Sequence, residues 1–188
     1  MSMKEAFEVF FEKNNDCWKR VMGTFPQVIK NNLNQNCNLF ISEEDENSGM
    51  IQWQPKKQTD KVDFTSAEEV LGFEIHPQIK AFLNTYWFLE LRGQTEEVHQ
   101  IQLDPVLPTM NLVSLAKESF NVEGYSFNQE DDYFLLASFC EIDGDDGYSL
   151  LVANKTGKVY AVQPIEKKSQ EIAESIEDLL LKMKGMWD

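Results

Sequence analysis

The amino-acid sequence predicts an α+β fold, in which helices pack against an antiparallel sheet. Residues 77–88 carry apolar side chains at the spacing of a helix face, whereas residues 133–140 form a dense apolar run typical of a buried strand. Residues 148–153 and 158–162 follow as two strand-like segments around a turn. Because the chain has 188 residues and 42% of them are hydrophobic, we expect one domain over residues 1–188 with a substantial core.

The first predicted element is a helix over residues 4–22. Apolar side chains recur on one face of this segment, and Asn14 interrupts that face. Gly23 and Pro26 follow, and both residue types commonly end helices. The residues expected on the apolar face are Phe7, Phe10, Phe11, Trp18 and Val21.

A hairpin is predicted next. Residues 38–42 and 50–54 are short and apolar enough to form its two strands. The segment between them is a long acidic tip that contains Glu43, Glu44, Asp45 and Glu46. Residues 56–63 are polar, and we expect them to form a loop.

Two helices are predicted after this loop. Ser66 is expected to cap a short helix through Leu71, because a hydroxyl can accept hydrogen bonds from the free amides of the first turn. Pro77 suits the first turn of a second helix, where its missing N–H would be unpaired anyway. The apolar face of the second helix comprises Ile79, Phe82, Leu83, Tyr86 and Trp87. We therefore expect Phe82 and Trp87 to be buried in the core.

The segment that follows is predicted to be a turn, a strand and a helix. Residues 92–95 contain a glycine and are expected to form the turn. Ile101 and Leu103 are expected to face inward in the strand. The helix then begins at Thr109 or Asn111, and its apolar face comprises Leu112, Leu115, Ala116 and Phe120.

The remaining segment is predicted to contain three strands and a helix. The apolar run at 133–140 is expected to be a central strand, followed by an acidic, glycine-containing turn at 141–147. The next hairpin turns around Asn154 and Gly157, residues that tolerate positive φ. Ser169 is expected to cap the last helix, whose apolar face comprises Ile172, Ile176, Leu179, Leu180 and Met183.

The chain is strongly acidic, with a formal net charge of −15 at pH 7. An anionic surface repels nucleic acid and acidic lipid, and it attracts a protein partner with a basic surface. The alternative is that the charge only keeps the protein soluble.

The cysteines and the N-terminal residues point to the cytoplasm. Cys17, Cys37 and Cys140 form no disulfide framework and no zinc-binding pattern, which is typical of a reducing compartment. The first twelve residues contain several glutamates and lack the apolar run of a signal peptide. No apolar run approaches the ~18 residues that a membrane-spanning helix needs.

No catalytic or metal-binding constellation is recognisable. The two histidines, His76 and His99, have no cysteine or carboxylate partner at a known spacing. Asp143, Asp145 and Asp146 partly resemble a calcium loop, but they lack its alternating order and the glutamate at its twelfth position. We therefore expect no enzymatic activity, no metal and no cofactor.

The tripeptide W-Q-P at residues 53–55 is followed about twenty residues later by I-x-P-x-I-x-x-F. This order and spacing of motifs resembles the Syd family of bacterial proteins. The residues that stand on family positions in this second motif are Ile75, Pro77, Ile79 and Phe82. Residues 150–159 match a later N-x-x-G hairpin of the family, and residues 172–183 match its terminal helix. Glu90 stands where Syd proteins commonly carry aspartate, although a solvent-facing residue at a helix end is the alternative explanation for it.

The resemblance implies a SUKH-type architecture and a cytoplasmic binding protein without catalytic activity. Syd proteins interact with SecY, the translocation channel, so this chain would associate with the membrane only peripherally, through its partner. The SUKH superfamily also contains immunity proteins, so neutralisation of one cognate toxin is the alternative. Cytoplasmic loops of membrane proteins are rich in lysine and arginine. The candidate partner-binding residues are therefore Glu43, Glu44, Asp45, Glu46, Glu90, Asp143, Asp145 and Asp146.

Overall fold

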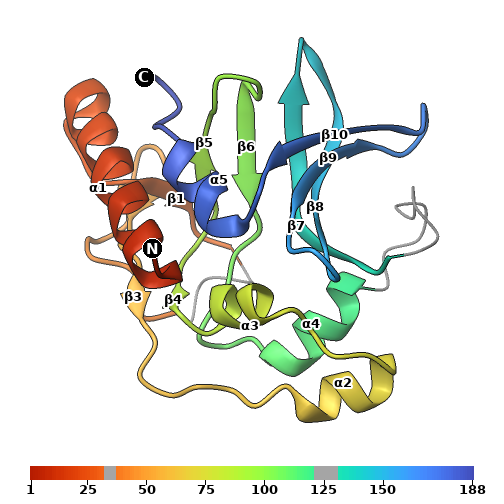
Figure 1. The fold of residues 1–188 in the computed structure, drawn as a ribbon. Coiled ribbons are helices and arrows are strands. Elements are labelled where there is room, and N and C mark those ends of the chain that lie inside the picture. Colours follow the sequence, from red (N-terminus) through yellow and green to blue (C-terminus); the bar gives the residue numbers. More distant parts are fainter. Residues whose placement is uncertain (32–36, 121–130) are drawn as a thin grey trace.

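The structure is a computed structural model that describes residues 1–31, 37–120 and 131–188 (Figure 1). Its centre is a six-stranded antiparallel sheet with the strand order β10-β9-β8-β7-β6-β5. The strands are β5 (Leu91–Gly93), β6 (Gln100–Leu103), β7 (Tyr133–Ile142), β8 (Asp145–Ala153), β9 (Val159–Gln163) and β10 (Lys168–Ala173). Helices pack against this sheet, so the predicted α+β fold is confirmed.

Strands β7 and β8 form the middle of the sheet, as the apolar run at 133–140 predicted. A two-residue turn joins them at Asp143 and Gly144, which have φ angles of 52° and 82°. Positive φ at both positions matches the twist of the flanking strands. The turn is shorter than the predicted 141–147, because Ile142 and Asp145 already pair with each other. The predicted hairpin around Asn154 and Gly157 is confirmed as β8–β9.

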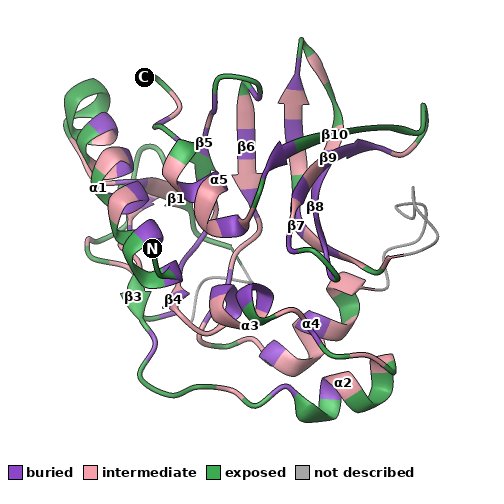
Figure 2. Ribbon diagram, in the orientation of Figure 1, coloured by how far each residue is buried: buried purple, intermediate pink, exposed green. Residues whose placement is uncertain are grey.

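Helix α1 (Met3–Met22) confirms the predicted first helix. The Ser2 hydroxyl accepts a hydrogen bond from the N–H of Glu5, and the Glu5 carboxylate accepts one from the Ser2 N–H at 2.8 Å. This reciprocal pair satisfies two amides that a helix start leaves free. Gly23 ends the helix with a φ of 71°. Val21 is exposed, contrary to prediction, because the last turns of α1 extend beyond the elements that cover it (Figure 2).

The core lies between the sheet and the helices. Helix α1 packs against α5 (Ile176–Lys182), and both lie at the β5–β6 end of the sheet (Figure 1). The other helices lie together below the sheet in that view; they are α2 (Thr65–Leu71), α3 (Pro77–Leu83) and α4 (Leu112–Phe120). The ring of Phe7 lies 5.6 Å from that of Phe82 and 5.5 Å from that of Phe88, so α1 and α3 share one aromatic centre.

Helix α3 is shorter than the predicted aromatic helix. It ends at Leu83, because the side chain of the next residue, Asn84, forms hydrogen bonds with the backbone of the loop that contains Val62. The Asn84 Oδ1 accepts a hydrogen bond from the Val62 N–H at 2.9 Å, and its Nδ2 donates to the Val62 carbonyl at 3.0 Å. These bonds fix Asn84 in a conformation that closes the helix.

The two aromatic residues after Asn84 form strand β4 (Tyr86–Trp87), which pairs with β3 (Lys56–Lys57). The prediction that 56–63 is entirely a loop is therefore wrong at its first two residues. Phe82 is buried as predicted. Trp87 is only partly buried, contrary to prediction, because it lies in a strand and not on the inner face of a helix.

The residue that begins α2 also differs from the prediction. The helix starts at Thr65, so Ser66 lies inside its first turn and does not cap it. The carboxylate of Asp63 instead accepts hydrogen bonds from the Thr65 N–H at 3.0 Å and from its hydroxyl at 2.7 Å.

The predicted turn at 92–95 is wrong at its start, because residues 91–93 form strand β5. A Cβ atom at Gly93 would lie 2.6 Å from the carbonyl oxygen of Lys184, whose backbone bridges Gln94. The glycine therefore allows two backbones to cross closely and does not mark a turn. The strand predicted around Ile101 and Leu103 is confirmed as β6, and both side chains are buried.

The last helix is also shorter than predicted. Residues 168–173 form the edge strand β10, so Ser169 pairs with Val162 and caps nothing. Helix α5 begins at Ile176, and the Ser175 hydroxyl caps it by accepting from the Asp178 N–H at 3.0 Å. Ile172 is buried near the end of β10. It lies four positions before Ile176, the first residue of α5, so it has the spacing of a helix face without belonging to the helix.

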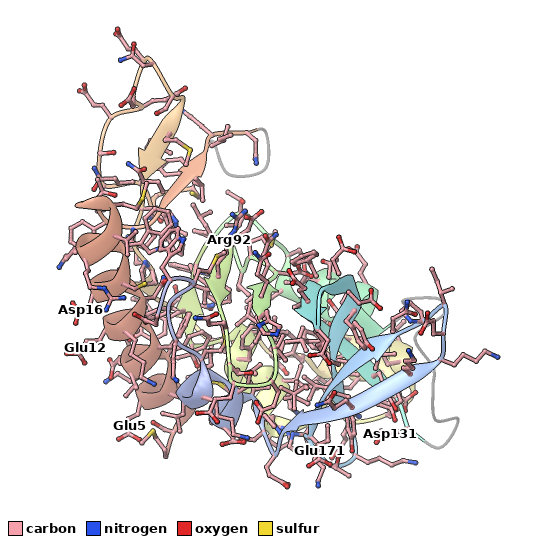
Figure 3. All side chains as sticks on the ribbon, turned by 90° about the horizontal axis from the view of Figure 1, so that it is seen from above. Glu5, Glu12, Asp16, Arg92, Asp131 and Glu171 are labelled. Carbon is pink, nitrogen blue, oxygen red and sulfur yellow. The ribbon has the colours of Figure 1, made fainter. Side chains whose placement is uncertain are left out.

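A separate two-stranded ribbon pairs β1 (Gln27–Ile29) with β2 (Met50–Gln52). The predicted hairpin of 38–42 with 50–54 is correct only in part. Phe40 and Trp53 form an isolated bridge, but no strand forms over 38–42. The ribbon lies on the face of β5 and β6 that is opposite to α5 (Figure 3).

Candidate functional site

The eight predicted partner-binding residues lie in three separate places. Four are exposed in the loop before β2, and these are Glu43, Glu44, Asp45 and Glu46. Three lie at the β7–β8 turn, and these are Asp143, Asp145 and Asp146. Glu90 immediately precedes β5. Figure 3 shows that the loop before β2 projects away from the six-stranded sheet, so the three groups form no single patch.

Two of these carboxylates help to form their own turns. The Asp45 carboxylate accepts hydrogen bonds from the N–H groups of Asn47 at 2.8 Å and Ser48 at 3.1 Å. The Asn47 bond is the main cause that lowers the pKa of Asp45. The Asp145 carboxylate likewise accepts from the Gly147 N–H at 2.9 Å. These two residues therefore have a local structural role that explains their identity without a partner.

The third place, around Glu90, has charged side chains from two adjacent segments of the sheet next to a cavity. The pairs Leu91–Leu103 and Phe88–Val106 fix the register between the two segments, and continuing it places Glu90 opposite Asp104. Leu91 and Leu103 are buried on the core face. Side chains alternate along a strand, so Glu90 and Asp104 point to the other face of the sheet. We call this the outer face.

Asp104 is held in place by the neighbouring strand. The Ser138 hydroxyl lies 2.7 and 2.6 Å from the two carboxylate oxygens of Asp104, so its single proton is shared between them, and the Ser138 N–H donates to one of them at 3.3 Å. Burial raises the pKa of Asp104, and the nearby charge of Glu90 acts in the same direction, while the Ser138 bonds oppose it. The outer face therefore holds two carboxylates that repel each other.

Arg92 supplies the positive charge at this site. Its guanidinium lies 2.9 Å from the Glu90 carboxylate, and the two side chains are 52% and 39% exposed. Both residues line a cavity of about 310 Å³ between the β1–β2 ribbon and the sheet. Figure 3 shows Arg92 between these two parts of the fold. Apolar side chains form much of the remaining wall, and they include Val28, Ile29, Met50, Leu89, Pro105 and Leu107.

A second cavity of about 300 Å³ lies beside the first on the outer face. Its lining includes Gln102, Phe139 and Met186, and also Arg92. Arg92 therefore lies between the two cavities. We call the two together the outer groove. A groove with apolar and polar side chains in its wall, Glu90 in its lining and Asp104 beside Glu90 suits a peptide segment that carries apolar and basic side chains.

The other chemically reactive side chains have structural roles. His76 lies at the start of α3, where its Nδ1 accepts from the Gln78 N–H at 3.4 Å, and burial lowers its pKa. His99 is exposed. Burial raises the pKa of Cys140 to about 12, so its thiol is a poor nucleophile. Within residues 1–31, 37–120 and 131–188, no three histidine, cysteine or acidic side chains are arranged to hold a metal ion.

Glu90 is the residue of the outer groove that the sequence proposes as a partner-binding residue, whereas Arg92 and Asp104 carry no comparable signal in the sequence. Arg92 was assigned to a turn, and the segment around Asp104 showed no clean alternation of apolar and polar residues. The feature that reveals the site is the register of β5 and β6, because it places the carboxylates of Glu90 and Asp104 opposite each other. This register is known only from the structure.

The comparisons with known proteins agree on one family. The model of the family "Syd protein (SUKH-2)" matches residues 4–185. Protein Syd of Shewanella loihica is 24% identical over 187 residues, which cover 98% of this chain and 83% of that protein. Protein Syd of Hahella chejuensis is 28% identical over 138 residues, which cover 72% of this chain and 68% of that protein. Protein Syd of Shewanella frigidimarina is 23% identical over 193 residues, covering 99% and 84%.

In the described part of the chain, no helix is both long and apolar enough to cross a membrane.

Proposed function

Since this chain belongs to the Syd family, we propose that it is a non-catalytic binding protein whose partner is the cytoplasmic face of the SecY channel. The match over residues 4–185 is the observation that carries this proposal, because it spans both the sheet and the helices. The proposed contact surface is the outer groove beside Glu90, the residue on a family acidic position.

The charge of the chain supports a basic partner. The formal net charge is −15 at pH 7, and exposed acidic residues such as Glu43 and Glu46 extend this field beyond the groove. Cytoplasmic loops of membrane proteins are enriched in lysine and arginine. An acidic protein is therefore steered toward such loops, and the effect weakens as salt rises. On this proposal the protein is cytoplasmic, and it reaches the membrane only through SecY.

The shape of the outer groove supports a peptide segment as the bound part of the partner. The cavity beside Glu90 has the volume of a few side chains, and six of its ten lining residues are apolar. Buried apolar contacts would supply affinity, and the carboxylates of Glu90 and Asp104 would select basic residues.

The experiment is a binding assay with membrane vesicles that contain or lack overproduced SecY. We expect the full chain to bind the SecY vesicles, and Glu90→Lys to weaken binding by about tenfold or more, since a charge reversal places two cations together. The matched control is Glu166→Lys, which makes the same charge change at the β9–β10 turn, near the opposite edge of the sheet.

Equal binding to both kinds of vesicle would refute SecY as the partner. Tight binding to a toxin encoded beside this gene, together with no binding to SecY, would assign the protein to the immunity branch of the superfamily. Equal weakening by Glu90→Lys and Glu166→Lys would show that only net charge matters and that the outer groove is not the contact surface.

A further inference from the structure

The outer groove contains a positive charge where the proposed partner would bring another. Arg92 lies on the wall of both cavities, and its guanidinium contacts the Glu90 carboxylate at 2.9 Å. A fixed cation at this place would repel a basic partner unless it can move away. Two features of the groove explain why an arginine is nevertheless present there.

The first feature is the pair of carboxylates that the register of the sheet places opposite each other. Glu90 and Asp104 lie opposite each other on adjacent segments, and like charges in this arrangement are destabilising. The Ser138 hydroxyl bonds to Asp104 but carries no charge. Within residues 1–31, 37–120 and 131–188, the ion pair formed at these two carboxylates joins Arg92 to Glu90. The two carboxylates therefore favour a positive charge at this point.

The second feature is the exposure of the ion pair between Arg92 and Glu90. The Arg92 and Glu90 side chains are 52% and 39% exposed, so their contact competes with water and is easily exchanged. The second cavity offers Arg92 another position. Its lining includes Phe139, and guanidinium groups are attracted to aromatic faces.

We propose that Arg92 is an internal substitute for an arginine side chain of the bound partner. The partner's arginine takes the place of Arg92 on Glu90, beside Asp104, and Arg92 turns into the second cavity. This inference rests on the proposed function for the site but concerns a residue that opposes binding. Arg92 thereby sets specificity, because a segment without an arginine cannot repay the loss of the Arg92–Glu90 contact.

The first test uses the isotope-labelled full chain and N-acetyl-arginine amide as the probe, followed by NMR. The control probe is N-acetyl-citrulline amide, which has nearly the same shape but no charge. We expect the arginine probe to shift the signals of Glu90, and Arg92→Gln to bind it about two- to fivefold more tightly than the wild type, the range of an exposed ion pair. Glu90→Gln is expected to lose this binding.

A matched variant controls for the change in net charge. Lys168 pairs with Glu166 two positions away, as Arg92 does with Glu90, and it is 62% exposed. It lies on β10, at the opposite edge of the sheet. Lys168→Gln therefore removes one positive charge with the same loss of an exposed pair, and we expect it to bind the probe as the wild type does.

The inference fails if Arg92→Gln binds the arginine probe no more tightly than Lys168→Gln, or if neither the wild type nor Arg92→Gln binds it. It also fails if the citrulline probe binds equally well. These outcomes are independent of SecY. Vesicle binding by the wild type with equal affinity in Arg92→Gln would keep SecY as the partner and remove Arg92 as its competitor. Tighter probe binding by Arg92→Gln without any vesicle binding would keep the role of Arg92 and reject SecY.

Discussion

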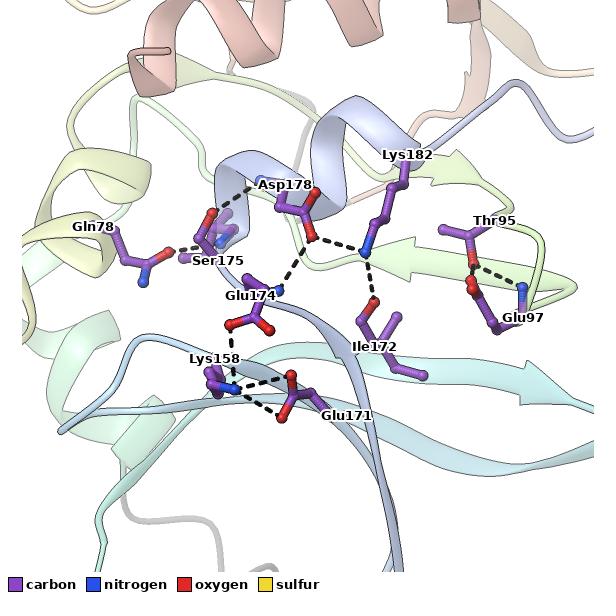
Figure 4. A network of polar contacts seen from close by, with 11 residues as sticks. Gln78, Thr95, Glu97, Lys158, Glu171, Ile172, Glu174, Ser175, Asp178 and Lys182 are labelled. Carbon is purple, nitrogen blue, oxygen red and sulfur yellow. Dashed lines mark hydrogen bonds and ion pairs between the residues drawn. The ribbon is translucent and has the colours of Figure 1, made fainter.

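The Oε1 atom of Gln78 accepts a hydrogen bond from the backbone N–H of Ile176 at 2.6 Å, although the two residues are 98 positions apart. The same side chain donates from Nε2 to the carbonyl of Gly157 at 2.8 Å. One buried amide therefore joins α3 to the start of α5 and to the β8–β9 turn. Figure 4 shows Gln78 beside Ser175 at the start of α5, with the ion pairs of Lys158 and Lys182 nearby.

Replacing Gln78 should therefore destabilise the whole fold. Gln78→Ala leaves a buried N–H at Ile176 and a buried carbonyl at Gly157 without partners, and each unsatisfied group costs about 1–3 kcal/mol. We expect urea denaturation to show a loss of about 3 kcal/mol. Gln170→Ala is the matched control, because Gln170 is exposed on β10 and should change stability by less than about 0.5 kcal/mol. Similar losses in both variants would contradict the linking role of Gln78.

Gly157 should tolerate no side chain. Its φ is +76°, and a Cβ atom there would lie 1.8 Å from the Nε2 of Gln78. Gly144 has a similar φ of +82°, but a Cβ atom would meet nothing within 4 Å. Gly144→Ala should therefore cost only the backbone strain of about 1–2 kcal/mol, and Gly157→Ala should cost about 1–3 kcal/mol more because the core must shift. Equal denaturation midpoints would refute the close approach of Gln78.

The two aromatic residues that the sequence predicted as core should differ in importance. Phe82 is 2% exposed and packs on Phe7, whereas Trp87 is only partly buried in β4. We expect Phe82→Ala to cost about 3–5 kcal/mol. Trp87→Ala should cost clearly less, although tryptophan is the larger side chain. Thermal unfolding of both variants tests this order, and an unchanged melting temperature in Phe82→Ala would contradict the assigned core.

Asp104 should make stability depend on pH in the acidic range. Its pKa in the folded state is raised by burial, so the folded protein binds more protons than the unfolded chain between the two pKa values. The contribution of Asp104 to the free energy of unfolding therefore decreases as pH rises through that interval. Asp104→Asn removes the effect, while the Ser138 hydroxyl can still donate to the amide oxygen. We expect Asp104→Asn to raise the melting temperature at pH 7 and to lose this advantage below about pH 4, the ordinary range of an aspartate. An advantage that is the same at both pH values would show that charge is not its cause.

The acidic loop before β2 should affect the rate of association more than the final affinity. Glu43, Glu44 and Glu46 are exposed, so reversing all three to lysine should leave the melting temperature nearly unchanged. We expect the association rate with SecY vesicles at low salt to fall by about tenfold. The difference from the wild type should shrink near 150 mM salt, where exposed charges are screened over about 8 Å. An association rate that ignores both salt and charge reversal would exclude steering by this loop.

The elements that the sequence predicted well are those with local causes. Helix α1 has its cap at Ser2 and its end at Gly23, and both act on neighbours within a few residues. The β8–β9 hairpin likewise turns at Gly157, whose positive φ is a local property. Such signals can be recognised without knowing the rest of the fold.

The elements that were mispredicted depend on distant partners. Helix α3 ends early because Asn84 binds the backbone of Val62, 22 positions before it. The sequence predicts a turn at Gly93, because nothing nearby in sequence reveals that the backbone of Lys184 crosses it. Asp104 became a candidate only when strand register placed it opposite Glu90. The sequence pattern therefore points to one residue of the candidate site, Glu90. Arg92 and Asp104 can be recognised only from the tertiary structure.

The contact between α1 and α5 determines when during synthesis this fold can be completed. Lys13 in α1 donates a hydrogen bond to the carbonyl of Leu181 in α5 at 2.6 Å, and 168 positions separate the two residues. A chain that emerges from the ribosome with its first helix must therefore keep the face of α1 that packs on α5 uncovered until α5 follows. Contacts over such separations form slowly, because a long loop has to close first. The first helix therefore needs protection from aggregation until α5 has emerged.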